Sequence, residues 1–133
     1  MPDIAIVGGG PAGATLALRL ARLGHAVVVY ERDPFTRPHD GESLHPGIWP
    51  LFDALRISDT GALRVHHSLV RWNDDSVVDQ HHERPQLAVL RPAFDAQLLA
   101  MAREAGAIVE QHAGFDGDAQ IVVDASGRSS WSR

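Results

Sequence analysis

Cysteine and lysine are both absent from the 133 residues of this chain. Without cysteine, the chain has no disulfide framework, no thiolate nucleophile, no redox-active dithiol and no cysteine-based metal site. All 12 basic residues are therefore arginines, and they are scattered along the sequence rather than clustered. This distribution predicts no basic surface for binding nucleic acid.

Long hydrophobic runs are also missing, and no apolar stretch approaches the roughly 20 residues that a membrane-spanning helix needs. The first residues lack the basic region of a secretory signal. We therefore expect a cytoplasmic protein with no membrane partner. Hydrophobic residues make up 44% of the chain and charged residues 22%, which is ordinary for a globular domain.

A strand, a glycine-rich turn, a helix and a second strand follow one another at the start of the chain. Residues 4–7 form a short apolar run, which predicts a strand buried on both faces. Apolar residues then recur at helical spacing over residues 12–23, and residues 26–30 form a second apolar run. This order predicts a βαβ unit whose two strands are parallel and adjacent.

The rest of the chain continues the alternation of strands and helices. We predict helices at 47–57 and 92–105, strands at 68–72, 86–90, 108–110 and 121–124, and loops at 32–46, between 72 and 86, and at 112–119. The predicted fold class is therefore α/β, a Rossmann-like three-layer fold with a mainly parallel sheet.

Gly8, Gly10 and Gly13 form a Gly-x-Gly-x-x-Gly pattern between the first strand and the first helix. The first glycine permits a tight turn, the second lets the backbone approach a diphosphate, and the third lets the helix pack closely. The N–H groups around Ala12 then face the phosphates. Glu31 lies 18 residues after Gly13, a spacing typical of a carboxylate that binds an adenosine ribose. The alternative is a turn without a ligand and a surface acid.

Two later segments also follow predicted strands. Arg91 precedes the second helix, where its guanidinium could reach a phosphate or a ribose, and the alternative is an exposed arginine at a helix start. Asp124 and Gly127 follow the last strand, and the carboxyl ends of parallel strands border the ligand crevice. The alternative there is an ordinary turn.

Histidine is frequent, with eight residues that include pairs at 66–67 and 81–82. Neither pair has a carboxylate at a clear ligand spacing, although Asp79 and Glu83 are close in sequence. We interpret both pairs as solvated loop histidines and predict no metal site. No residue of the chain is predicted to be a catalytic acid, base or nucleophile.

Four segments together resemble FAD-dependent monooxygenases and their relatives, including aromatic hydroxylases, geranylgeranyl reductases and tryptophan-halogenase-like oxidoreductases. Residues 7–13 with 30–32 resemble the family's amino terminus, and residues 41–46 resemble the GESL-P loop of the halogenase-like branch. Residues 90–99 resemble an R-x-x-F-D-x-x-L segment, and residues 123–130 resemble a VDATGRSS motif. These segments occur in the family's order and are spread over nearly the whole chain, from residue 7 to residue 130.

The resemblance implies FAD rather than NAD as the cofactor. It implies that the glycine turn holds the diphosphate, that Glu31 holds the adenosine ribose, and that the loop at 41–43 approaches the flavin. Arg91 would lie along the cofactor. The implied cofactor-binding residues are Gly8, Gly10, Pro11, Ala12, Gly13, Glu31, Arg32, Ser43, Arg91, Asp124 and Gly127.

The family's members continue for some hundreds of residues, which carry a second FAD motif and the substrate domain. They also have a long β-meander where this chain has about ten residues, at 111–120. We therefore predict a truncated, single FAD-binding domain over residues 1–133 that lacks the substrate domain, binds FAD weakly alone and turns over little. The halogenase branch's catalytic lysine cannot be present in a lysine-free chain.

The expected partners are FAD, an electron donor such as NAD(P)H, and a missing domain or second copy of the chain. Two alternatives stand beside this function. One is an NAD-binding Rossmann module of a dehydrogenase, against which the segments at 41–46 and Arg91 argue. The other is a non-catalytic remnant that acts as an interaction module.

Overall fold

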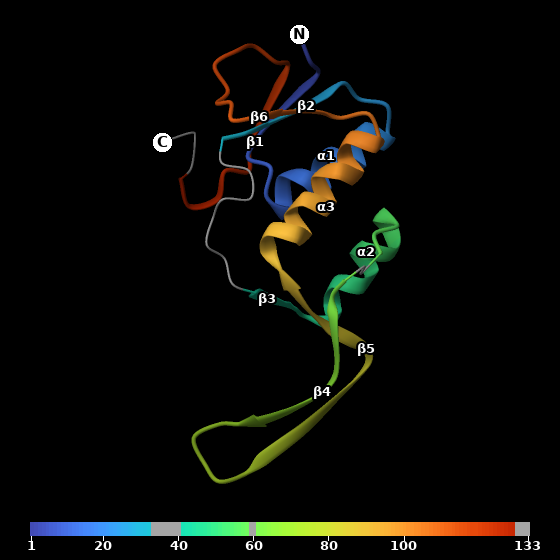
Figure 1. Ribbon diagram of the computed structural model, residues 1–133, viewed down its shortest axis with the longest axis vertical. Coiled ribbons are helices and arrows are strands. Elements are labelled where there is room, and N and C mark those ends of the chain that lie inside the picture. The colour runs from blue at the N-terminus through green and yellow to red at the C-terminus, as the bar shows by residue number, and fades with distance from the viewer. Residues whose placement is uncertain (33–40, 59–60, 130–133) are drawn as a thin grey trace. The chain divides into compact units, whose positions relative to one another are not determined.

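The computed structural model describes residues 1–32, 41–58 and 61–129. Their contacts divide into two compact units, of which the first combines Met1–His39 with Pro92–Arg133 and the second is Asp40–Arg91. Each unit has its own sheet, of four strands in the first and three in the second (Figure 1). That the whole chain acts as a single FAD-binding domain stays a prediction.

A parallel sheet forms the centre of the first unit. Its strands run in the order β6-β2-β1-β7, and every neighbouring pair is parallel. The predicted βαβ unit is confirmed, because helix α1 joins the adjacent strands β1 and β2. The elements of this sheet and its connections are β1 (Ile4–Val7), α1 (Pro11–Arg22), β2 (Val27–Glu31), α3 (Arg91–Glu104), β6 (Ile108–Gln111), β7 (Ile121–Asp124) and the short helix η2 (Gly127–Ser129).

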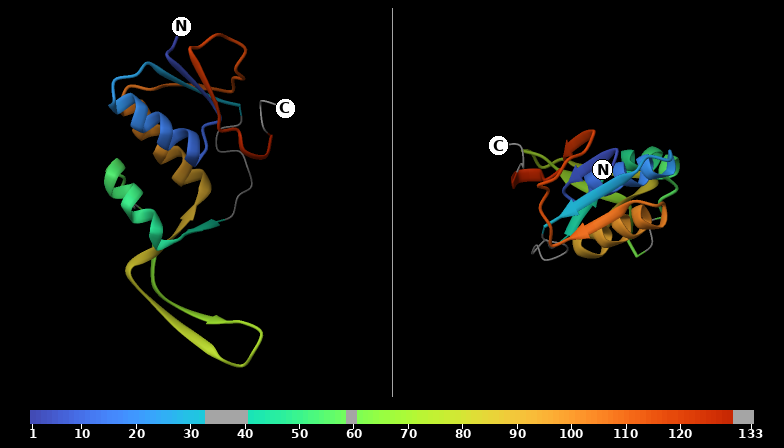
Figure 2. Two further views of the ribbon diagram at one scale, coloured as in Figure 1. Left: turned by 180° about the vertical axis from the view of Figure 1, so that it is seen from behind. Right: turned by 90° about the horizontal axis from the view of Figure 1, so that it is seen from above.

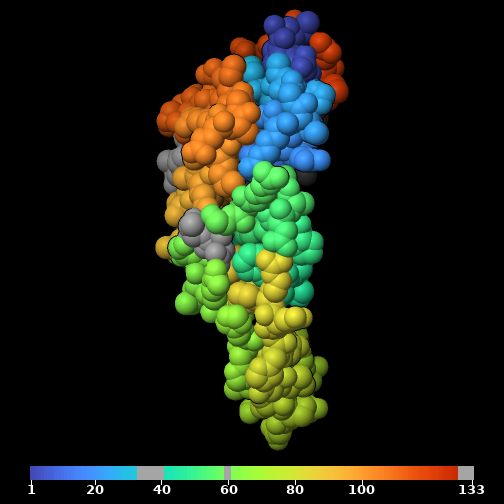
Figure 3. All heavy atoms as spheres, turned by 90° about the vertical axis from the view of Figure 1, so that its right-hand side faces the viewer, coloured from blue at the N-terminus to red at the C-terminus, as the bar shows by residue number. Residues whose placement is uncertain are grey.

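Helices α1 and α3 lie side by side on one face of this sheet (Figures 1 and 2). In the space-filling view, the blue atoms of α1 contact the orange atoms of α3 and the segment after it (Figure 3). The largest fully buried side chains of the first unit are Ile6, Leu18, Val29, Leu98 and Leu99. In the described ranges, none of the helices is long and apolar enough to cross a membrane.

The opposite face of the sheet is covered by the segment 112–120 rather than by a helix. Phe115 of this segment is only 8% exposed and packs with Ala5 and Val7 of β1. Its ring centroid lies 5.2 Å from that of Tyr30 in β2. The predicted three-layer α/β fold with a mainly parallel sheet is therefore confirmed, with helices, sheet and this segment as its layers. The sequence predicts a loop at 112–119, and the burial of Phe115 within this loop was not predicted.

Shortening Phe115 to alanine is expected to lower the free energy of unfolding by about 3 kcal/mol, because it removes the aromatic ring that covers this face of the sheet. Urea unfolding followed by circular dichroism measures the loss. The control Phe115→Leu keeps most of the apolar volume and should cost about 1 kcal/mol. A loss below about 0.5 kcal/mol in the alanine variant, within the range of ordinary surface substitutions, would contradict the packing described here.

The second unit contains an antiparallel sheet with strand order β3-β5-β4. Its strands are β3 (Gly41–Leu44), β4 (Leu63–Arg71) and β5 (Val77–Leu90). The predicted loop between residues 72 and 86 is wrong, because most of it belongs to β5, which pairs with β4 in a long hairpin. The predicted loop at 32–46 is wrong at β3, and residues 33–40 lie outside the described part of the chain.

The predicted helix at 47–57 is present as a short helix η1 (Pro46–Ile48) followed by α2 (Trp49–Leu55). The indole Nε1 of Trp49 donates a hydrogen bond of 2.8 Å to the carbonyl of Pro85 in β5. The guanidinium of Arg84 lies 4.3 Å from the ring centroid of Trp49 and pairs with Asp53. Hydrogen bonding to Arg84 holds the pKa of the Asp53 carboxyl below its usual range. These contacts join α2 to the sheet of the second unit.

Candidate functional site

The turn between β1 and α1 has no room for a side chain at two of its glycines. A Cβ atom at Gly13 would lie 1.9 Å from the carbonyl oxygen of Gly8. A Cβ at Gly8 would lie 2.4 Å from the carbonyl oxygen of Ala125, and Gly8 has a φ of +107°, which favours glycine. The start of α1, the end of β1 and the segment after β7 therefore pack backbone against backbone.

Gly10 has the opposite surroundings, because a Cβ there would have no heavy atom within 4 Å. It precedes Pro11, the first residue of α1, and no side chain caps this end of the helix. The amide of Ala14 donates to the carbonyl of Gly10 at 2.9 Å, so the N–H groups of Ala12 and Gly13 lie in the first turn, ahead of the helical hydrogen bonds. Open space beside the positive end of a helix dipole suits an anion such as a diphosphate.

Glu31, the last residue of β2, points back at this turn. Its side chain is buried, and Oε2 accepts a hydrogen bond of 2.7 Å from the backbone N–H of Gly9. A Cβ at Gly9 would lie 3.1 Å from Glu31 Oε2 and 3.2 Å from Leu99 Cδ1 of α3. The absence of a side chain at Gly9 therefore allows the Glu31 carboxylate to approach the backbone of the turn. Gly9 was not among the predicted site residues, because the glycine pattern leaves that position variable. The run of three glycines was the signal that could have identified it.

Strand β7 brings Asp124 to the same edge of the sheet. Asp124 is the register partner of Val7, and the amide of Ala125 donates to the Val7 carbonyl at 2.8 Å. The carboxylate of Asp124 accepts a hydrogen bond of 3.0 Å from the amide of Ser126, which forms a tight turn before Gly127. The structure thus places the residues after β7 beside the glycine turn, as the rule for parallel strands predicts.

Ser43 and Arg91 lie in the second unit. Strand β3 pairs with the end of β5, so that Ser43 is opposite Ala88. The guanidinium Nη1 of Arg91 lies 2.8 Å from Oε2 of Glu42, and the Arg91 side chain is 21% exposed. Two segments that are far apart in sequence are therefore neighbours, and the ion pair that joins them was not predicted from the sequence.

The predicted site residues thus form two groups. The glycine turn, Glu31 and the segment Asp124 to Gly127 come together in the first unit, with Arg32 exposed directly after β2. Ser43 and Arg91 come together in the second.

The relationship of the whole sequence to known protein families agrees with this arrangement of the site. A model of the family described as FAD dependent oxidoreductase matches residues 3–128. The chain belongs to this family. FAD is the family's cofactor, so the predicted choice of FAD over NAD is confirmed at the level of the family.

Individual members of the family show the same relationship. The flavin-dependent halogenase armH3 of Armillaria mellea is 35% identical over 114 residues, which cover 78% of this chain and 23% of that protein. The solved structure of CmlS, a flavin-dependent halogenase, is 32% identical with a TM-score of 0.72 and covers 84% of this chain and 22% of that one. The chain therefore spans less than a quarter of the length of these two halogenases.

A more distant structure supports the fold alone. 2-Methyl-3-hydroxypyridine-5-carboxylic acid oxygenase superposes with a TM-score of 0.80 at 20% identity, over 98% of this chain and 40% of that one. The family model and the two halogenases, not this structure, confirm the resemblance to the FAD-dependent monooxygenases and their halogenase-like relatives that four sequence segments first indicated.

Proposed function

We propose that this chain binds FAD at the turn between β1 and α1, with the diphosphate at the start of α1 and the adenosine ribose at Glu31. One observation carries the proposal. The uncapped end of α1 adjoins open space at Gly10, while the Glu31 carboxylate is held 2.7 Å from the amide of Gly9. An anion-binding helix end and a ribose-binding acid are the two features that an adenosine diphosphate moiety requires.

Each residue of the turn has a distinct part in this proposal. The N–H groups of Ala12 and Gly13 donate to phosphate oxygens, and Pro11 begins the helix without an N–H group that would need a partner. The carboxylate of Glu31 accepts hydrogen bonds from the ribose hydroxyls, and its charge disfavours a ribose carrying a 2′-phosphate. On the resemblance of their segments, we extend the cofactor-binding set to the remaining predicted residues, which are Arg32, Ser43, Arg91, Asp124 and Gly127.

The chemistry that this binding serves is oxidation of the monooxygenase or halogenase-like kind. When bound, FAD supplies hydride and electron transfer and can activate dioxygen. The residues of this chain bind and orient the cofactor, and none is assigned as an acid, base or nucleophile. An electron donor such as NAD(P)H completes the proposed function.

A titration of the purified chain with FAD, followed by quenching of flavin fluorescence, tests the proposal. We expect saturable binding of one FAD per chain and no comparable binding of NAD⁺, which is measured by competition. Preferential binding of NAD⁺, or the absence of saturable binding by a chain shown to be folded, would contradict it.

The variant Glu31→Gln is expected to weaken FAD binding by about tenfold or more, because hydrogen bonds to a charged acceptor contribute about 1.5–3 kcal/mol. The same titration measures the change. Glu110→Gln is the matched control, since Glu110 is an exposed acid on the neighbouring strand β6 and its replacement removes the same charge. Equal weakening in both variants would point to a general charge effect and against a ribose contact.

A further inference from the structure

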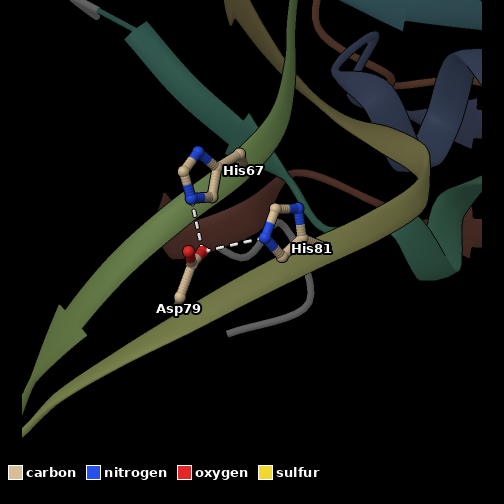
Figure 4. A group of neighbouring side chains, drawn as sticks. All are labelled: His67, Asp79 and His81. Carbon is tan, nitrogen blue, oxygen red and sulfur yellow. Dashed lines mark ion pairs between the residues drawn. The ribbon is translucent and has the colours of Figure 1, made fainter.

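Three side chains that commonly bind metals gather on one face of the β4–β5 hairpin (Figure 4). His67 of β4 lies directly opposite His81 of β5, and Asp79 lies opposite Leu69, two residues further along β4. Because successive side chains of a strand alternate between faces, His67, Asp79 and His81 share one face. Strand pairing, rather than spacing in the sequence, brings the three together.

The two imidazoles converge on a single carboxylate oxygen. Nε2 of His67 contacts Oδ1 of Asp79, and Nε2 of His81 lies 3.3 Å from the same oxygen. The rings are stacked, with centroids 4.5 Å apart and planes inclined by 11°. The three ligand atoms all lie within 4.8 Å of one another. In tetrahedral zinc sites, bond lengths of about 2.0–2.2 Å place neighbouring ligand atoms roughly 3.3–3.6 Å apart. Small side-chain rotations would therefore bring all three atoms around one ion.

The ligand types select a class of metal. Two imidazole nitrogens and one carboxylate oxygen suit Zn²⁺ and similar divalent transition metals, whereas Mg²⁺ and Ca²⁺ prefer oxygen ligands throughout. The side chains of His67 and Asp79 are each 49% exposed, and that of His81 is 73% exposed. The remaining coordination positions are therefore open to water, as in zinc sites with three protein ligands.

We propose that His67, Asp79 and His81 form a surface site for a divalent transition metal such as Zn²⁺, with water completing the coordination. No metal site was predicted from the sequence, because these residues were expected in loops and the pairing of the two strands was not recognised. A bound ion would cross-link β4 to β5 and replace the contacts that the imidazoles make with Asp79. This site is separate from the proposed FAD-binding function, and its test does not depend on FAD.

The test is a titration of the full chain, prepared without a histidine tag, with Zn²⁺ in competition with a chromophoric chelator. The expected result is one saturable Zn²⁺ site per chain and no detectable binding of Mg²⁺. His67→Ala and Asp79→Asn should each weaken Zn²⁺ binding by about tenfold or more, since the loss of even an outer-shell partner commonly costs that much. The matched control His66→Ala removes the adjacent exposed histidine, which is not in the cluster, and should leave the affinity unchanged.

Equal weakening by all three substitutions, or an unchanged affinity in His67→Ala, would overturn the proposal in favour of non-specific binding to exposed histidines. A second measurement needs no variant. Paramagnetic Ni²⁺, added at less than one equivalent to the unaltered chain, should broaden the ring resonances of His67 and His81 before those of the other histidines. Broadening that begins at any other histidine would also overturn the proposal.

Discussion

The variant Gly13→Ala is expected to lose about 3 kcal/mol or more of its free energy of unfolding. The added Cβ would lie 1.9 Å from the carbonyl oxygen of Gly8, and that oxygen belongs to the backbone, so it cannot rotate aside. Helix α1 would have to move away from β1. Alanine favours a helix over glycine by about 1 kcal/mol, which is too little to offset this clash. Urea unfolding followed by circular dichroism measures the loss.

The matched control is Gly10→Ala, in the same turn. A Cβ at Gly10 would have no heavy atom within 4 Å, so the unfolding free energy of this variant should stay within about 1 kcal/mol of the original value. If Gly13→Ala proved as stable as the unaltered chain, α1 would not pack on β1 as the structure shows.

The variant Gly10→Val is expected to remain folded and to lose FAD binding by about 100-fold. Gly10 has φ −70° and ψ −175°, an extended conformation that valine adopts readily, so the expected loss of stability is about 1 kcal/mol or less. The valine side chain would occupy the open space in which we place the diphosphate. Loss of two hydrogen bonds to a charged group accounts for an effect of this size.

Flavin fluorescence titration measures the affinity of Gly10→Val, and circular dichroism verifies that the variant is folded. Gly10→Ala, with a smaller side chain, should bind FAD with intermediate affinity. Undiminished FAD binding by folded Gly10→Val would place the diphosphate elsewhere. This substitution separates cofactor binding from folding, which Gly8 and Gly13 cannot do, because both glycines are packed against backbone atoms.

The glycine turn could be predicted from the sequence because its determinants are local. The spacing of Gly8, Gly10 and Gly13 and the position of Glu31 lie within one βαβ unit. The apolar run of β1 correctly predicted burial on both faces, since all four of its residues are buried. The sequence could not identify the segment that covers the face of the sheet opposite the helices. Phe115 is an aromatic residue in a polar stretch, and its burial depends on side chains from β1 and β2.

The hairpin was missed for a different physical reason. Most residues of β4 and of the first half of β5 are exposed, so neither strand shows the alternation of apolar and polar residues by which a half-buried strand is recognised. Each of these two strands is defined by its pairing with the other. The sequence of a single segment does not encode that pairing. The ion pair between Glu42 and Arg91 likewise depends on the register of β3 against β5, over a separation of 49 residues.

The proposed function depends on backbone amides at the start of α1 that hold a diphosphate. An amide chemical-shift titration of the isotope-labelled chain with ADP, which carries the diphosphate and the adenosine ribose of FAD, tests it most directly. We expect the largest shifts at Gly9, Gly10, Ala12, Gly13 and Ala14. If saturating concentrations of ADP and of FAD left the chemical shifts of these amides unchanged in a folded chain, this binding of the diphosphate would be contradicted.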